Sequence, residues 1–182
     1  MADVKQTPPS QPVTKKGMST GAKVGIGIGI GCCVIILIII GLILGGVWKI
    51  GNTVQKKQNY ANQFTEIADN INNALRDFDN GLNVTLKKSP NFDSSDYNSV
   101  DKNQKIIQDN YDRLVKLDVP QDYQEIQNLY EQGIKDYLDG MKIYRTGLQS
   151  KNINDFQKSS DLFKQGQSKL EQAKKKLDEK NK

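Results

Sequence analysis

Histidine is absent from this chain of 182 residues, and its two cysteines, Cys32 and Cys33, stand next to each other. Without histidine the chain lacks the commonest general base, the commonest metal ligand and the usual pH-sensitive side chain. Because no cysteine follows Cys33, residues 51–182 have no disulfide framework and depend on packing for stability. That part of the sequence also shows no nucleophile motif and no metal-ligand spacing. We therefore predict a protein that is not an enzyme and that uses no cofactor or metal.

An excess of positive charge is also missing from the larger part of the chain. Residues 1–50 hold five lysines and one aspartate, and so carry +4 of the total net charge of +5. A nucleic-acid-binding domain is expected to show a basic stripe on its folded part. The charge distribution therefore predicts no nucleic-acid partner. It places the positive excess beside an apolar block, which favours a membrane.

The apolar block runs from Val24 to Trp48 and holds 25 residues without a charge. A helix of that length spans ~37 Å, more than the ~30 Å hydrocarbon core of a bilayer. Trp48 and Lys49 suit the membrane interface. A phosphate-binding loop would need an α/β pattern after it, and a lipoprotein signal would need a longer apolar run before Cys32. We predict a single transmembrane helix within an anchor at 22–50.

Glycines recur in this block at four-residue spacing, which places them on shared faces of a helix. Small residues on one face let a second membrane helix approach closely. Glycine is also simply common in membrane helices. Two interpretations stay open: ordinary composition, or a packing surface for self-association or a membrane-protein partner. The glycines concerned are Gly25 and Gly29, Gly27 and Gly31, and Gly41 and Gly45.

The segments around the anchor predict how the protein is oriented. Residues 1–21 are basic, contain proline and lack apolar periodicity, so we predict a disordered tail. A short tail before an anchor, with a larger domain after it, is typical of a signal-anchor protein. We therefore predict a single-pass protein of the cell membrane, with its N-terminus in the cytoplasm and residues 51–182 outside as an extracytoplasmic domain.

Heptad patterns predict that residues 51–182 are all-α. Turn formers around Pro90, Pro120 and Asn152 divide this part into four helices, at roughly 52–86, 98–117, 120–149 and 152–179. A large residue is followed three positions later by a small one, and the pair repeats every seven residues. We therefore predict an up-down antiparallel four-helix bundle with coiled-coil-like heptads. The clearest repeats are Tyr130/Gly133, Tyr137/Gly140 and Tyr144/Gly147, then Phe156/Ser159, Phe163/Gly166 and Leu170/Ala173.

A stripe of tyrosines on the third helix leaves two interpretations open. Tyr123, Tyr130, Tyr137 and Tyr144 recur every seven residues and share one helix face. Such rings either form part of the core or line a groove for an aromatic, glycan or peptide ligand. A hollow between the helices would favour the groove.

Two groups of lysines predict contact between the domain and the lipid bilayer. Four antiparallel helices return the end of the last helix to the level at which the first one leaves the membrane. Lys56 and Lys57 would then lie beside Lys174, Lys175 and Lys176, facing anionic headgroups.

The sequence favours a membrane-anchored helical bundle without catalytic chemistry. One expected function is an extracytoplasmic interaction or ligand-sensing module. The alternative is a structural or accessory subunit of a membrane complex that docks through the glycines of its anchor. A pocket lined by the tyrosines would favour sensing, whereas a solid core would favour assembly.

Overall fold

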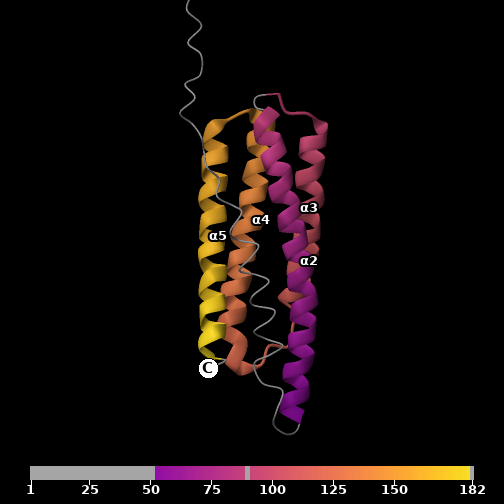
Figure 1. The fold of residues 1–182 in the computed structure, drawn as a ribbon, viewed down its shortest axis with the longest axis vertical. Coiled ribbons are helices and arrows are strands. Elements are labelled where there is room, and N and C mark those ends of the chain that lie inside the picture. Colours follow the sequence, from indigo (N-terminus) through magenta and orange to yellow (C-terminus); the bar gives the residue numbers. More distant parts are fainter. Residues whose placement is uncertain (1–51, 89–90, 181–182) are drawn as a thin grey trace, which may run out of the picture.

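The computed structural model describes residues 52–88 and 91–180, which form four long α-helices (Figure 1). The helices are α2 (Asn52–Lys88), α3 (Ser94–Leu114), α4 (Gln124–Ser150) and α5 (Ile153–Lys180), with a 3-10 turn, η2 (Gln121–Tyr123), before α4. The all-helical class and the bundle of four helices are confirmed within these residues. The predicted tail at 1–21 and the predicted anchor at 22–50 lie outside the described residues.

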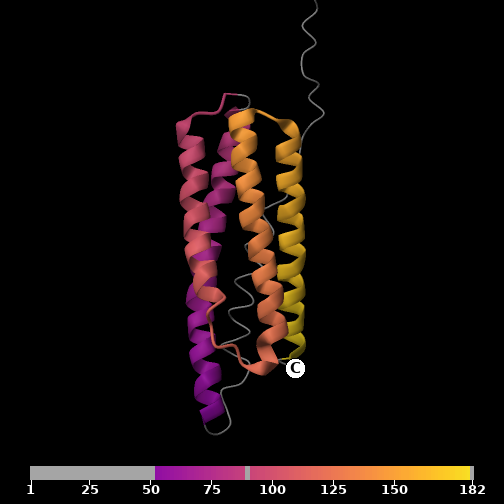
Figure 2. The same cartoon turned by 180° about the vertical axis from the view of Figure 1, so that it is seen from behind.

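The helices run alternately in opposite directions along the long axis of the molecule (Figures 1 and 2). The α2–α3 and α4–α5 connections lie at one end, which we call the turn end. The start of α2, η2 and the end of α5 lie together at the opposite end, which we call the entry end. Segments at the two extremes of the described chain therefore share one end of the bundle.

The boundaries of α3 differ from the predicted 98–117. The helix begins at Ser94 because Asp93 caps it, accepting a hydrogen bond from the Ser95 amide at 2.8 Å. The Asp96 carboxylate in turn accepts one from the Asp93 amide at 2.9 Å, which completes a capping box. At its other end α3 stops at Leu114, six residues before Pro120. This proline favours extended backbone in the residue before it.

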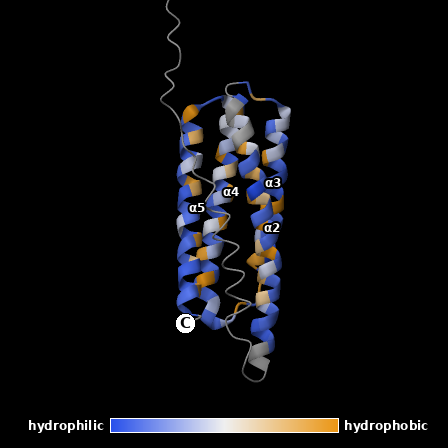
Figure 3. Ribbon diagram, viewed as in Figure 1, coloured by the Kyte–Doolittle hydropathy of each residue, from blue (hydrophilic) through white to orange (hydrophobic). Residues whose placement is uncertain are grey.

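The core lies along the large heptad positions, and apolar residues recur on each helix among hydrophilic ones (Figure 3). It is rich in aromatic rings, which pack against one another between helices. Tyr130 lies 4.9 Å from Phe64, and Tyr137 stacks on Phe163 at 5.6 Å, measured between ring centroids. The largest side chains that are fully buried are Tyr130, Tyr144, Phe64, Phe78, Ile67, Ile71, Ile107, Leu114, Ile134 and Met141.

Glycines bring α4 and α5 into direct backbone contact. A Cβ atom placed on Gly166 would lie 2.8 Å from the carbonyl oxygen of Gly133. One placed on Gly140 would lie 2.6 Å from the Phe163 ring. The predicted alternation of large and small residues therefore acts across this pair of helices, because each ring occupies the space beside a glycine of its partner.

The interface between α2 and α5 is less closely packed than the interface between α4 and α5, and we call it the α2–α5 seam. Close backbone contacts join α4 to α5, α2 to α3 and α3 to α4, whereas α2 and α5 share few. A side-chain contact that crosses this seam is that of Phe78 on α2 with Phe163 on α5, whose ring centroids are 5.6 Å apart. The bundle is thus least tightly closed along the α2–α5 seam.

None of the helices formed by residues 52–88 and 91–180 combines the length and the apolarity that crossing a membrane requires.

Candidate functional site

The entry end gathers the lysines that the sequence singled out, together with acidic partners. Lys56 lies 2.8 Å from Asp118, and Lys57 lies 2.6 Å from Asp122. Lys180 reaches the same Asp122 carboxylate at 3.5 Å, so this side chain ties the start of α2 to the end of α5 through η2. These links are exposed, and each such pair is worth up to about 1 kcal/mol.

The lysines of α5 are paired as well. Lys176 lies 2.7 Å from Glu125 on α4, while Lys174 pairs with Asp178 one turn later at 3.0 Å. Lys175 lies 4.0 Å from Glu179. The structure thus brings both predicted lysine groups to one end of the bundle, but it also surrounds them with carboxylates that sequence reasoning overlooked. Contact with anionic headgroups stays a prediction, and the carboxylates weaken the electrostatic attraction on which it rests.

A cleft of about 410 Å³ opens at the entry end between the first turns of α2 and the α3–α4 connection. Three amide side chains from α2 lie along it at four-residue spacing, which puts them on one helix face. The Lys56–Asp118 ion pair bridges α2 and the connection beside it. The full lining is Gln55, Lys56, Asn59, Tyr60, Gln63, Leu117 and Asp118.

The lining of the cleft offers mainly hydrogen-bonding groups, together with the Lys56–Asp118 ion pair. Amide side chains both donate and accept hydrogen bonds, and they carry no proton to transfer at neutral pH. The Tyr60 hydroxyl is buried and already donates to Gln127 Oε1 at 2.8 Å. No group of three or more aspartate, glutamate, histidine or cysteine residues that could hold a metal ion occurs in the described part of the chain.

The tyrosine stripe lies mostly inside the bundle. Tyr130, Tyr137 and Tyr144 are buried against rings of the neighbouring helices, with exposed fractions of 0, 3 and 1%. Tyr123, at the entry end, is partly exposed and packs 5.7 Å from Tyr60, with the Lys180 ammonium 5.0 Å from its ring centroid. Burial raises the pKa of the Tyr130 and Tyr144 phenols well above their usual value, so both stay neutral.

The Tyr130 hydroxyl has no hydrogen-bond partner among the residues that the structure describes, although it is fully buried. We expect Tyr130→Phe to raise the free energy of unfolding by roughly 1 kcal/mol, because the unpaired hydroxyl is removed without a change of shape. Tyr60→Phe is the matched control: it breaks the bond to Gln127 and should lower that free energy by about 1 kcal/mol. Chemical denaturation of both variants measures the difference. Equal losses would contradict this account of Tyr130.

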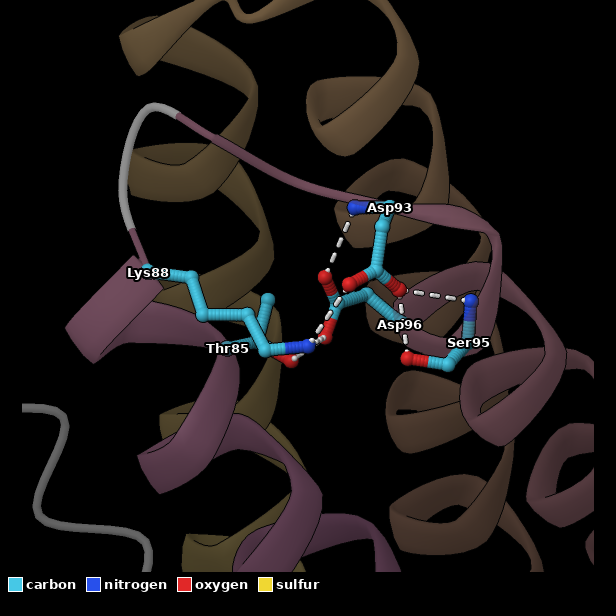
Figure 4. A network of polar contacts seen from close by, with 5 residues as sticks. All are labelled: Thr85, Lys88, Asp93, Ser95 and Asp96. Atoms are coloured by element: carbon cyan, nitrogen blue, oxygen red, sulfur yellow. Dashed lines mark hydrogen bonds and ion pairs between the residues drawn. The ribbon is translucent and has the colours of Figure 1, made fainter.

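A polar network at the turn end was not expected from the sequence (Figure 4). The buried Asp96 carboxylate accepts hydrogen bonds from Thr85 at 3.0 Å, from Lys88 at 3.1 Å and from the Asp93 amide. Burial favours the neutral acid, but these three donors outweigh it and lower the pKa of Asp96. The network fixes the α2–α3 connection. The only sequence signal for it is an aspartate three residues after the capping Asp93.

The predicted membrane-helix packing positions, Gly25, Gly27, Gly29, Gly31, Gly41 and Gly45, lie outside the described residues. Comparison of the chain with protein-family models, with curated proteins and with solved structures finds no match.

Proposed function

We propose that this protein is a membrane-anchored, non-enzymatic helical bundle that works by holding a partner at its surface. The observation that carries the proposal is the burial of the tyrosine stripe in an aromatic core. Three of the four striped tyrosines pack against phenylalanine rings, and the cleft described above lies at the entry end, away from Tyr137 and Tyr144. This favours a rigid interaction or assembly module over a sensor that binds a ligand between its helices.

The proposal includes an architecture that extends beyond the described helices. Residues 22–50 act as a transmembrane anchor, the tail lies in the cytoplasm, and the bundle with its coiled-coil-like heptads lies outside. The 25 uncharged residues before the bundle support the anchor. The entry end would then face the bilayer, because α2 begins directly after the anchor. Partners are therefore membrane proteins or other copies of this chain, held at that end of the bundle or beside the anchor.

Affinity capture of the full-length protein from its native membrane, followed by mass spectrometry, tests this function. Two double variants separate the two proposed contact surfaces. Asn59→Lys with Gln63→Lys alters the cleft, whereas Gly25→Leu with Gly29→Leu alters the anchor face. Asn73→Lys with Asn80→Lys is the matched control, because both asparagines are exposed on α2 outside the cleft.

We expect the control to retain the captured partner and one of the other variants to lose it. Loss with the cleft variant would assign the interaction to the bundle, and loss with the glycine variant would support the accessory-subunit alternative. In-membrane crosslinking of the glycine variant distinguishes self-association from a different partner. If no protein is captured specifically, or if all three variants retain the same set, the proposed function is wrong.

A further inference from the structure

The side of α2 that faces α5 can be located from its contacts. Phe78 touches Phe163 of α5, while Asn70 and Glu66 bond to α3, to Asn110 at 3.3 Å and Arg113 at 2.8 Å. Successive residues of a helix turn by about 100°. Asp79 therefore lies on the face of α2 that is on the other side of Phe78 from α3. It belongs to the α2–α5 seam.

Asp79 is the last of three polar residues spaced one heptad apart along this seam, after Thr65 and Asn72. Each of them has an oxygen that is shielded from solvent and that no donor of the described residues reaches: Thr65 Oγ1, Asn72 Oδ1 and Asp79 Oδ1. Asn72 is only 2% exposed, whereas Thr65 and Asp79 are partly exposed, so the middle of the stripe lies deepest. Oxygens of this kind destabilise a packed interface, and an ionised carboxylate does so most.

Within residues 52–88 and 91–180, no ion pair joins a cation to the Asp79 carboxylate. On α5 the charged side chains on either side of Phe163, Asp161 and Lys164, lie 3.8 Å from each other. Arg76, one turn earlier on α2, is exposed. Of the charged residues of α4 near this level, Asp139 and Lys142 pair with each other at 3.1 Å and Arg145 pairs with Asp101 of α3, which packs on the opposite side of α2. Burial therefore acts alone and raises the pKa of Asp79 to about 7.

We propose that the α2–α5 seam is a proton-controlled joint in which Asp79 decides whether the two helices stay together. The neutral acid fits the closed seam. In the closed seam the shielded oxygen of the carboxylate has no donor among the described residues, so ionisation favours moving α2 away from α5. Separation breaks few backbone contacts there, and the Phe78–Phe163 ring contact is one that it interrupts. The joint closes in acid and loosens as the pH rises through neutrality, which gives a chain without histidine a response to pH.

The distance between spin labels on the two helices tests this joint in the full-length protein. Asn80 on α2 and Gln165 on α5 are exposed and suit labelling, once Cys32 and Cys33 have been changed to serine. At about pH 5 we expect one narrow distribution of distances, and at about pH 9 a longer and broader one, with the change centred near neutral pH.

Three variants make the outcome decisive. Asp79→Asn is neutral at every pH and should keep the narrow distribution under both conditions. Asp79→Leu should also keep it, and this variant shows whether an amide at position 79 perturbs packing by itself. Asp77→Asn is the matched control, because Asp77 is exposed on the same helix; it should retain the full pH response. A distribution that does not change with pH in the unaltered chain, or a response that survives in Asp79→Asn, overturns the proposal.

Discussion

Replacing Phe78 with alanine is expected to lower the free energy of unfolding by about 3–5 kcal/mol, which is the typical cost of deleting a buried aromatic ring. Phe78 is 2% exposed, and its ring lies 5.8 Å from Tyr144 and 5.6 Å from Phe163. The side chain therefore joins α2 to both α4 and α5. The neighbouring rings of Tyr144 and Phe163 are themselves closely packed, Phe163 against Gly140. They therefore cannot easily move into the cavity that the substitution leaves. Urea denaturation followed by circular dichroism measures the loss.

Phe92→Ala is the control for this prediction. Phe92 lies in the α2–α3 connection, is only partly buried and has one ring contact, with Phe156 at 5.9 Å. Its removal should cost about 1–2 kcal/mol, because less apolar area returns to water. If Phe78→Ala costs no more than Phe92→Ala, then Phe78 does not hold α2 against the other helices in the manner described.

Replacing Gly166 with alanine is expected to destabilise the bundle by roughly 1–3 kcal/mol, the usual range for overpacking. In an ordinary helix the same change would stabilise by about 1 kcal/mol. The sign is reversed because the new methyl group would lie 2.8 Å from the Gly133 carbonyl oxygen and 2.8 Å from the Tyr137 ring. Backbone cannot rotate out of the way as a side chain can, so α4 and α5 must move apart.

Gly81→Ala provides the contrast for Gly166→Ala. A Cβ atom on Gly81 would lie 3.0 Å from the Ser99 hydroxyl oxygen, which can turn to another rotamer. We expect Gly81→Ala to leave stability unchanged or to raise it by up to about 1 kcal/mol. Thermal denaturation of the two variants compares them directly. A stabilised Gly166→Ala protein would show that the glycines are not required for the close approach of α4 and α5.

The fold of the described residues follows from the sequence because the heptad signal is strong and local. A tyrosine followed three residues later by a glycine recurs three times in α4, at Tyr130, Tyr137 and Tyr144. This repeat predicts both the core face of α4 and the small residues that lie opposite the rings of α5. The predicted start of α3, at 98, lies four residues after the observed start at Ser94. The error arose because a capping box built from two aspartates resembles an ordinary polar loop.

The contacts of the candidate site were harder to predict, because they join residues far apart in the chain. Nothing near Lys57 in the sequence indicates Asp122, 65 residues later, as its partner. Nor does the local pattern distinguish Asp79 from the exposed Asp77, since both are aspartates next to the apolar Phe78. Only the position of α5 relative to α2 shields one carboxylate oxygen of Asp79 from solvent. Burial of a single polar residue is a property of the assembled helices.

The entry end has a mechanical consequence. Lys57 and Lys180 meet on the Asp122 carboxylate, so η2 links the first described helix to the last. A force that pulls these two helices apart from that end loads their contacts one turn at a time, as in peeling. A force applied between the entry end and the turn end loads every turn of a helix pair at once, in shear. The bundle is therefore stiffer along its length than across the α2–α5 seam, where few backbone contacts join the helices.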